Sequence, residues 1–270
     1  MAPTRRQSQS VPLRSVVGQA GTGTGKTAAF ALPLLHRMAA AKANNTPGAT
    51  LILVPTRELA MQVSEAVRKY GKPLGLHSLA VFGGQSFGDQ SRGLKRGADV
   101  VVATPGRLLD HMRRGTFPHR EIMAVVLDEA DEMLDMGFAD DIEAILAELP
   151  PKRQTMLFSA TMPPRIARIA DRNLRNPVRI TIARPTQASG EAPKVRQTAY
   201  LVPPGFKAAT LVRILDMEAP SSAIVFCRTR SETDELTHML VERNYRAASL
   251  HGGMTQDQRD RVMKNFREET

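Results

Sequence analysis

The sequence predicts an α/β fold in which a doubly wound parallel sheet carries helices on both faces. Short β-branched runs alternate along the chain with longer segments of helical periodicity, and this alternation is typical of parallel sheets whose connections are helices. The runs are mostly apolar, which indicates strands that are buried on both faces. With 270 residues, of which 42% are hydrophobic, the chain has room for one large domain or two modest ones.

The predicted strands and helices of the first domain follow one another in order. Strands are expected at 50–54, 99–103, 123–127 and 155–158. Helices are expected around them, at 27–38, 57–70, 108–113, 132–149 and 163–174. This series predicts one doubly wound domain over residues 1–182.

A break in this pattern separates a second, shorter region. Residues 183–196 contain Pro, Gly, Ser and Gln in a mixture that indicates a linker. The alternation then resumes, with strands expected near 197–202, 223–227 and 247–250 and helices expected near 207–218, after a capping pattern at 231–234, and from 255. Residues 197–270 are fewer than the roughly 100–150 of a typical domain, so only part of a second doubly wound domain is expected there.

The strongest local motif is a glycine-rich segment, Ala20-Gly-Thr-Gly-Thr-Gly-Lys-Thr27, between an apolar pair at 16–17 and an apolar helix. A strand, a glycine-rich turn and a helix form a phosphate cradle, because backbone N–H groups and the helix N-terminus face the anion. Lys26 would reach the outer phosphates and the Thr27 hydroxyl would hold Mg²⁺. The other expected nucleotide contacts in this loop are Gly21, Thr22, Gly23, Thr24 and Gly25. The generic pattern begins with glycine where this chain has Ala20, and the plainer alternative is a flexible Gly/Thr loop.

A second motif, Asp128-Glu-Ala-Asp131, directly follows the predicted strand at 123–127. Carboxylates at the carboxyl end of a buried parallel strand lie where such sheets bind ligands. Asp128 can hold the Mg²⁺ that bridges two phosphates, and Glu129 can orient or deprotonate the attacking water. The alternative is an acidic helix N-terminus, which the helix dipole favours. The position downstream of a phosphate loop favours the catalytic interpretation.

The charge distribution is compatible with a polyanionic partner. The formal net charge is +10, and a basic chain gains affinity for nucleic acid by releasing condensed counterions. A solubilising surface explains the net value equally well. Positive and negative residues are, however, concentrated in different parts of the sequence, because residues 1–50 contain no Asp or Glu and residues 121–148 contain no Lys or Arg. Separate anion and cation sites are therefore expected.

The single cysteine and the absence of long apolar runs bear on the compartment. Cys227 has no partner for a disulfide within the chain and is expected to be a buried, reduced thiol. No run of the sequence reaches transmembrane length, and residues 1–10 have no apolar signal core. These features predict a cytoplasmic protein without a membrane partner.

Further motifs form an ordered series around the two described above. Ser159-Ala-Thr161 follows the acidic tetrapeptide, and Pro55-Thr-Arg-Glu-Leu59, Gly83-Gly84 and Thr104-Pro-Gly-Arg107 precede it. Towards the end come Ala223-Ile-Val-Phe-Cys227 and Gln256-Asp-Gln-Arg259. In this order the motifs resemble the DEAD-box family of ATP-dependent RNA helicases over nearly the whole chain. The resemblance implies a RecA-like first domain, a partial RecA-like second domain, ATP and Mg²⁺ as ligands, and RNA as partner.

The resemblance also implies a role for each matching residue. Lys26, Asp128 and Glu129 would be catalytic, with Thr27 and Asp128 as metal ligands. Hydroxyl–carboxylate hydrogen bonds among Asp131, Ser159 and Thr161 would couple hydrolysis to RNA binding. The implied RNA contacts are Pro55, Thr56, Arg57, Gly84, Thr104, Gly106, Arg107, Gln256 and Arg259. Because such groups reach phosphate and sugar, RNA would be bound without reading of its base sequence.

Both ends of the sequence depart from the family pattern. The family recognises adenine through a glutamine in a Pro-Thr-x-x-Gln setting, and Pro3-Thr-Arg-Arg-Gln7 offers Gln7 for that contact, with Arg5 and Arg6 in place of the usual residues. The family's motifs V and VI, which supply arginine fingers, follow the Q-x-x-R element, and this sequence stops at Thr270. Since an arginine finger is worth roughly 10³–10⁵ in rate, the chain alone is expected to bind nucleotide but to hydrolyse it poorly.

Two interpretations of the activity therefore stay open at the level of the sequence. The first is RNA-stimulated ATP hydrolysis coupled to local duplex unwinding, and the second is a nucleotide- and RNA-binding module with little turnover. A switch GTPase is disfavoured because no Asn-Lys-x-Asp sequence occurs. A small-molecule kinase is disfavoured because the motifs at 55–59 and 159–161 have no role in one.

Overall fold

The structure, a computed structural model, describes residues 14–21, 23–44, 48–182, 195–203 and 205–268. The chain divides into two units, Met1–Thr186 (unit 1) and Gln187–Thr270 (unit 2). The linker predicted at 183–196 lies outside the described residues except for its last two positions. Gln7 and Thr22, two of the predicted nucleotide contacts, also lie outside the described residues.

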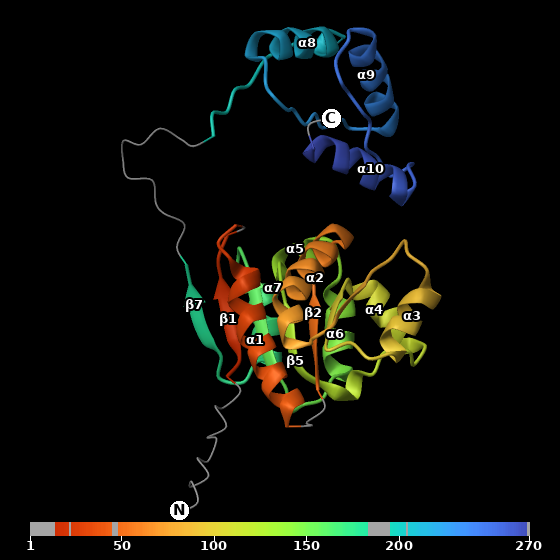
Figure 1. Ribbon diagram of the computed structural model, residues 1–270. Helices are drawn as coiled ribbons and strands as arrows, with labels where there is room; N and C mark the ends of the chain where they lie inside the picture. The colour runs from red at the N-terminus through yellow and green to blue at the C-terminus, as the bar shows by residue number, and fades with distance from the viewer. Residues whose placement is uncertain (1–13, 22, 45–47, 183–194, 204, 269–270) are drawn as a thin grey trace, which may run out of the picture. The chain divides into compact units, whose positions relative to one another are not determined.

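Unit 1 is built on a seven-stranded sheet with the strand order β3-β4-β2-β5-β6-β1-β7 (Figure 1). Every strand pair in it is parallel. Because β1 lies between β6 and β7, its connection to β2 passes over two strands. The strands are β1 (Val16–Gln19), β2 (Ala49–Leu53), β3 (Ser78–Val81), β4 (Val100–Ala103), β5 (Ile122–Leu127), β6 (Gln154–Ser159) and β7 (Val178–Thr181).

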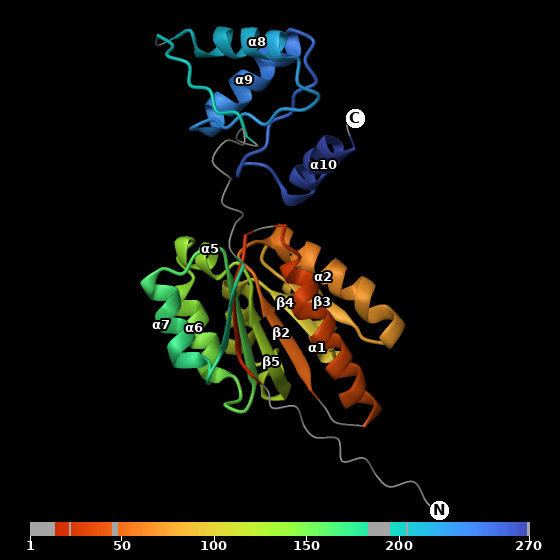
Figure 2. The same cartoon turned by 90° about the vertical axis from the view of Figure 1, so that its left-hand side faces the viewer.

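Helices cover both faces of this sheet (Figure 2). Helices α1 and α2 pack on one face, and α4, α5, α6 and α7 pack on the other. The helices of unit 1 are α1 (Lys26–Ala43), α2 (Arg57–Gly71), η1 (Lys72–Leu74), α3 (Phe87–Lys95), α4 (Pro105–Arg113), η2 (His119–Glu121), α5 (Ala130–Asp135), α6 (Ala139–Glu148) and α7 (Pro164–Asn173). The predicted doubly wound parallel sheet is confirmed. Within the described residues, no helix is both long enough and apolar enough to cross a membrane.

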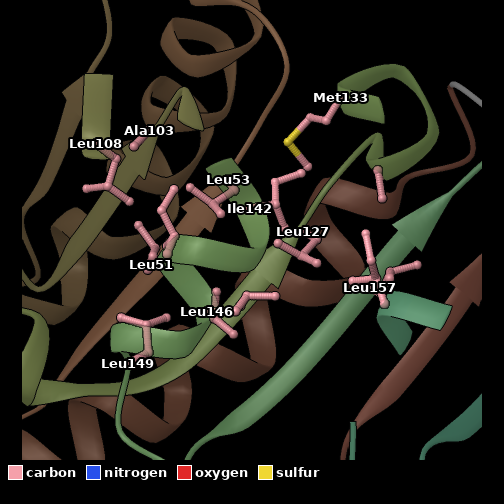
Figure 3. Close-up of a cluster of buried hydrophobic side chains, with 14 of the residues drawn as sticks. Leu51, Leu53, Ala103, Leu108, Leu127, Met133, Ile142, Leu146, Leu149 and Leu157 are labelled. Atoms are coloured by element: carbon pink, nitrogen blue, oxygen red, sulfur yellow. The ribbon is translucent and has the colours of Figure 1, made fainter. Parts of the chain in front are cut away.

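Strand β2 shows why the central strands are apolar throughout. Its five residues are all buried, and successive side chains of a strand point to opposite faces. Leu51 and Leu53 therefore join the apolar cluster under α4–α7 (Figure 3), while Ile52 joins the cluster under α1 and α2. Each fully buried aliphatic side chain of this kind contributes about 1.5–3 kcal/mol of hydrophobic stabilisation. The two clusters hold the strand ends, and hence the loops that follow them, in fixed positions.

The structure corrects the sequence prediction in two parts of unit 1. The helix predicted at 132–149 is two helices, because Gly137 between α5 and α6 has φ +88°, a left-handed conformation that interrupts a helix and suits glycine. Strands β3 and β7 and helix α3 were not predicted. All four residues of β7 are exposed, so this edge strand lacks the apolar run that marks a buried one.

The described residues of unit 2 form three helices: α8 (Lys207–Glu218), α9 (Arg230–Glu242) and α10 (Gln256–Arg267). Two of them begin with capping boxes, in which Thr229 pairs with Glu232 and Thr255 pairs with Gln258. The capping pattern predicted at 231–234 is therefore two residues too late. A capping box satisfies backbone N–H groups locally, which explains why these helices form without a large core beneath them.

The strands predicted in unit 2 are wrong for the described residues, since none of 197–202, 223–227 and 247–250 forms a ladder. A strand is stable only when a neighbour pairs with its backbone groups. Ile224 and Phe226 remain 66% and 93% exposed, so no apolar layer holds these segments together. Cys227 is half-buried rather than buried for the same reason.

Candidate functional site

The strand order brings the predicted nucleotide-binding motifs to one edge of the sheet. Strands β1, β6 and β5 are neighbours, and their carboxyl ends lead into the glycine-rich turn, Ser159 and Asp128. The Ala20 N–H donates to the Ser159 carbonyl at 3.1 Å, and the Asp128 N–H donates to the Leu53 carbonyl at 2.9 Å. Backbone hydrogen bonds therefore hold both motifs at the ends of their strands.

The glycine-rich turn has the geometry of an anion-binding loop. Gly23 and Gly25 have φ +76° and +84°, and a Cβ atom at either position would stand in open space. Gly25 is also the N-cap of α1 and makes no side-chain cap, so the first N–H groups of α1 have no capping side chain. The Thr24 hydroxyl closes the turn on the Gly21 carbonyl at 2.8 Å. An anion in this turn would meet backbone N–H groups and the positive end of the helix dipole.

Lys26 and Glu129 meet across this edge, although 103 positions separate them in the sequence. Lys26 Nζ lies 3.2 Å from Glu129 Oε1, and their side chains are 7% and 15% exposed. Glu129 itself has φ +53°, a left-handed conformation that costs a non-glycine residue about 1–3 kcal/mol. Strain of this size persists where the surrounding structure fixes it, and it is concentrated at functional sites.

Asp128 is the most deeply buried carboxylate of the site. It is 2% exposed, and burial raises its pKa to about 6, against the opposing effect of Lys26. The Glu129 N–H donates to Asp128 Oδ1 at 3.1 Å. A carboxylate whose charged form is poorly solvated is stabilised strongly by a bound cation. Together with Thr27 on the first turn of α1, Asp128 supplies the oxygen ligands that Mg²⁺ prefers, so these residues fit a nucleotide and its metal.

Asp131 links the acidic motif to the segment after β6. Its Oδ2 accepts from both the Thr161 N–H and the Thr161 hydroxyl, each at 2.8 Å. Burial raises the pKa of Asp131, but these hydrogen bonds outweigh it and the net pKa is lowered. The Ser159 hydroxyl accepts from the Asp131 N–H at 3.2 Å, and it also helps to lower the pKa of the Asp131 carboxyl. Asp131 Oδ1 is buried without a hydrogen-bond partner in the described structure.

The predicted RNA contacts of unit 1 lie at the other half of the same edge. Strands β3, β4 and β2 are neighbours, and the loops that follow them carry Gly84, Thr104–Arg107 and Pro55–Arg57. Thr56 caps α2 by accepting from the Leu59 N–H at 3.2 Å. The Arg57 guanidinium lies against Gly84. The φ of +89° favours glycine at position 84, and a Cβ atom there would displace the flexible guanidinium of Arg57.

Arg107 projects from the first turn of α4 towards the loop after β3. Its Nη1 donates to the Gln85 carbonyl at 3.1 Å and to Gln90 Oε1 at 3.3 Å. Thr104 is the N-cap of α4 but makes no side-chain cap, and Pro105 occupies the first turn. Gly106 is exposed. The loops after β3 and β4 therefore form one connected surface.

Behind Arg107 lies a cluster of side chains that the sequence did not single out. Gln90 and His111 are 3% and 0% exposed, and the Phe87 ring stacks on the His111 ring with centroids 4.0 Å apart. The guanidinium of Arg114 lies 4.4 Å from the Phe87 ring centroid. Burial, followed by the charge of Arg107, lowers the pKa of His111. No spacing rule marks these residues, because they come from two helices and meet only in the fold.

Gln256 and Arg259 lie on the first turns of α10 in unit 2. Gln256 Nε2 donates to Asp260 Oδ1 at 2.9 Å, and Arg259 Nη1 donates to Gln256 Oε1 at 3.4 Å. Arg259 Nε is buried without a hydrogen-bond partner in the described part of the chain. The two residues therefore form one pair on the helix surface.

Comparison with known proteins agrees with this arrangement. Residues 4–169 match the family model described as DEAD/DEAH box helicase, and residues 206–270 match the one described as helicase conserved C-terminal domain. The DEAD-box ATP-dependent RNA helicase RhpA of Helicobacter pylori is 46% identical over 264 residues, which cover 96% of this chain and 52% of the relative. CshA of Geobacillus kaustophilus, another DEAD-box ATP-dependent RNA helicase, is 44% identical, over 97% of this chain and 56% of the relative.

A solved structure with a similar fold comes from a hyperthermophile. A DEAD box protein from Methanococcus jannaschii superposes with a TM-score of 0.60 and 35% sequence identity, over 95% of this chain and 67% of that one. The chain spans about half the length of the curated relatives it matches, with 52% of one and 56% of another covered.

Proposed function

Because the chain belongs to the DEAD/DEAH box helicase family, we propose that it is an ATP-dependent RNA helicase of the DEAD-box type, in which RNA stimulates ATP hydrolysis and hydrolysis drives local unwinding of RNA duplexes. The observation that carries this proposal is the 3.2 Å contact between Lys26 Nζ and Glu129 Oε1 beside the buried Asp128. A phosphate-binding lysine, a metal-binding carboxylate and a water-orienting carboxylate are the three groups that phosphoryl transfer to water requires. A cytoplasmic location is part of the proposal, because RNA substrates are abundant there.

The nucleotide would lie with its phosphates in the turn of Gly21–Thr27, where the left-handed Gly23 and Gly25 are exposed and leave open space beside the backbone. Lys26 and Glu129 neutralise each other in the structure, and the triphosphate would compete for Lys26. Glu129 would then be released to orient the attacking water. Thr27 and Asp128 would hold Mg²⁺, which when bound offsets the charge of the β- and γ-phosphates.

RNA would bind along the loops after β2, β3 and β4. The groups there are guanidinium, hydroxyl and glycine N–H groups of Arg57, Arg107, Thr56, Thr104, Gly84 and Gly106, supported by Pro55. Such groups contact phosphate and sugar rather than base edges, which supports binding that is independent of base sequence. In unit 2, Gln256 and Arg259 would add contacts of the same kind.

Asp131 would connect the acidic motif after β5 to the segment after β6. It receives two hydrogen bonds from Thr161 at 2.8 Å and holds Ser159 through its own N–H. A rearrangement of this group on hydrolysis would reposition the segment after β6. Thr161→Val, which removes one of these bonds, is therefore expected to preserve nucleotide binding and to reduce RNA stimulation.

The decisive experiment measures binding of a fluorescent ATP analogue and ATP turnover, each with and without single-stranded oligouridylate RNA. Lys26→Ala is expected to weaken nucleotide binding by at least about tenfold, the effect of losing roughly 1.4 kcal/mol. Glu129→Gln is expected to retain binding and to lose turnover. Lys69→Ala changes an exposed lysine of α2 and serves as the matched control.

Two results would contradict the proposal. If Lys26→Ala binds nucleotide as tightly as the parent chain, the phosphate-loop assignment is wrong. If RNA changes neither nucleotide affinity nor turnover of the parent chain, RNA is not its effector. Nucleotide and RNA binding without turnover would instead favour the second interpretation, a binding module.

A further inference from the structure

We infer that Gln90 is a positioning residue that fixes Arg107 and the Gly83–Gly84 loop in a single RNA-binding arrangement, although Gln90 itself does not reach the RNA. The inference rests on the proposed function and extends it to a buried side chain beneath the proposed RNA surface. It follows from the hydrogen bonds of Gln90, which join three segments of the chain.

Gln90 lies on α3 and is only 3% exposed. Its Nε2 donates to the Phe82 carbonyl at 2.8 Å, at the end of β3 and directly before Gly83. Its Oε1 accepts from Arg107 Nη1 at 3.3 Å and from His111 Nε2 at 3.2 Å. Both ends of one amide are therefore occupied, one by the residue that follows β3 and the other by two residues of α4.

The chemistry of the partners fixes the orientation of this amide. The Phe82 carbonyl can only accept a hydrogen bond and the Arg107 guanidinium can only donate one, so the amide nitrogen must face Phe82 and the oxygen must face Arg107. Because that oxygen only accepts, His111 Nε2 must carry a hydrogen. His111 Nδ1 in turn lies 2.8 Å from the Thr116 hydroxyl. The contacts among Gln90, Phe82, Arg107 and His111 Nε2 therefore have one consistent assignment of donors and acceptors, while the Thr116 hydroxyl can donate either to His111 Nδ1 or to the His111 carbonyl.

Gln90 and Arg107 hold the glycine loop from its two sides. Gln90 is bonded to the residue before Gly83, and Arg107 Nη1 is bonded to the carbonyl of Gln85, the residue after Gly84, at 3.1 Å. Loss of the Gln90 amide would free the end of β3 and remove one of the two acceptors of Arg107 at the same time. While Gln90 is in place, by contrast, the remaining N–H groups of the Arg107 guanidinium face a phosphate in one fixed direction.

The alternative is that Gln90 is a buried polar group that serves stability alone. The two roles predict different outcomes for a pair of substitutions. A positioning residue of this kind acts partly through Arg107, so its loss should cost less once Arg107 has been removed, when only the part that acts through the Phe82 carbonyl remains. A merely structural residue should weaken RNA binding to the same extent in either background, because independent effects add.

The test measures the Kd for labelled single-stranded oligouridylate RNA at one fixed salt concentration, since affinity for RNA depends steeply on salt. Gln90→Met keeps the length of the side chain and removes its hydrogen bonds. It is expected to weaken RNA binding by about five- to twentyfold, a loss of roughly 1–2 kcal/mol, and to leave the Kd for a fluorescent ATP analogue within about twofold. In an Arg107→Ala background the same change should cost clearly less than in the parent background, so that the two losses do not add.

Leu174→Ala provides the control for stability, because Leu174 is a buried core residue after α7 with no proposed contact to RNA. Its RNA affinity should match that of the parent at a temperature where both are folded. The inference is overturned if Gln90→Met binds RNA like the parent, if Leu174→Ala shows the same loss, or if the losses of Gln90→Met and Arg107→Ala add. If the parent chain itself does not bind RNA, the proposed function fails and this inference fails with it.

A second pair of variants decides the matter if Gln90→Met does not fold. His111→Gln places an amide nitrogen near the position of Nε2 and keeps a donor to Gln90, while His111→Asn places one near the position of Nδ1. His111→Gln is expected to retain RNA affinity within about threefold, and His111→Asn is expected to lose more than that. Equal affinities of these two variants would overturn the inference.

Discussion

Units 1 and 2 form different secondary structures from similar sequence patterns. Both contain short apolar runs followed by well-capped helices, yet unit 1 has a seven-stranded sheet while the described part of unit 2 has helices and no strand. Helices close their hydrogen bonds within one segment and can form locally. Strands depend on neighbours, and among the described residues only those of unit 1 provide layers of helices that bury a sheet on both faces.

The comparison also explains where the chemistry lies. In unit 1, two buried clusters fix the strand ends, and groups far apart in the sequence, such as Lys26 and Glu129, meet at 3.2 Å. In unit 2, Gln256 and Arg259 contact each other within one helix. Unit 2 also has contacts between separate segments, such as His251 Nε2 to Asp234 Oδ1 at 3.0 Å, but its described residues include no sheet that fixes several strand ends along one edge.

The largest expected difference between the units is in hydrogen exchange. Amides of β5 bond to strands on both sides and exchange only through unfolding of unit 1, which for ordinary domains costs about 5–15 kcal/mol. Amides at 223–227 have no ladder partner. Mass spectrometry on the whole chain should find β5 protected at least about 10³-fold more than 223–227. Protection within about tenfold would show that 223–227 forms a paired strand in solution.

Core substitutions should show a smaller but clear difference in stability. Leu157 in β6 is fully buried, so Leu157→Ala should lower the free energy of unfolding by about 2–5 kcal/mol. Phe226 is 93% exposed, and Phe226→Ala should change it by less than about 0.5 kcal/mol. Urea unfolding followed by far-ultraviolet circular dichroism measures both values. A cost for Phe226→Ala close to that for Leu157→Ala would mean that Phe226 is buried in solution.

The pKa of Asp128 gives a prediction with a definite sign. Burial raises this pKa from 3.8 to about 6, so between these values the folded protein keeps a proton that the unfolded chain has released. Stability therefore falls as pH rises through this window, by about 3 kcal/mol at most, and the penalty stays constant above it. Asp128→Asn should stabilise unit 1 by about 1–3 kcal/mol at pH 7.5 and by much less at pH 4.

This measurement needs a chelator, because a bound cation would stabilise the charged carboxylate, and it needs a control in unit 2. Asp257 is exposed on α10, and Asp257→Asn should change stability by less than about 0.5 kcal/mol at either pH. A destabilising effect of Asp128→Asn at pH 7.5 would show that the charged form is favoured in the fold. Such a result would contradict the argument that the Asp128 carboxylate is poorly solvated and is therefore stabilised by a bound cation.

Local and continuous signals in the sequence were enough to predict much of unit 1. The helix predicted at 57–70 matches α2, because Thr56 caps it, and the strand predicted at 50–54 matches β2, because five successive residues are buried. The edge strand β7 was missed because its residues are exposed and carry no apolar run, whereas β3 was missed although residues 79–82 are apolar. The strand order could not be derived from sequence, since it depends on pairings between distant segments.

The same distinction applies to the site. The phosphate loop and the acidic tetrapeptide are contiguous motifs, so sequence alone singled out Lys26 and Asp128. Gln90 was missed because its partners Phe82, Arg107 and His111 stand 8, 17 and 21 positions away, at no spacing that a local rule contains. Side chains that support a site from beneath are found only when the fold brings their partners together.

The smallest expected effect on stability comes from the threonine N-caps of α2 in unit 1 and of α9 in unit 2. Thr56 caps α2 with a hydrogen bond of 3.2 Å from the Leu59 N–H, and Thr229 caps α9 with one of 3.2 Å from the Glu232 N–H. Replacing a threonine N-cap by alanine costs about 1 kcal/mol. In unit 1 this cost should appear in full as a lower free energy of unfolding for Thr56→Ala, because α2 packs on the sheet.

In unit 2, replacing the threonine N-cap by alanine should destabilise α9 alone. Thr229→Ala should leave the urea unfolding of unit 1 unchanged and speed hydrogen exchange of the α9 amides by about fivefold, the equivalent of roughly 1 kcal/mol. Thr56→Ser and Thr229→Ser keep the hydroxyl acceptor and should behave like the parent in both measurements. If Thr229→Ala instead lowers the unfolding free energy of unit 1, the two units unfold as one, and their different architectures do not reflect separate stabilities.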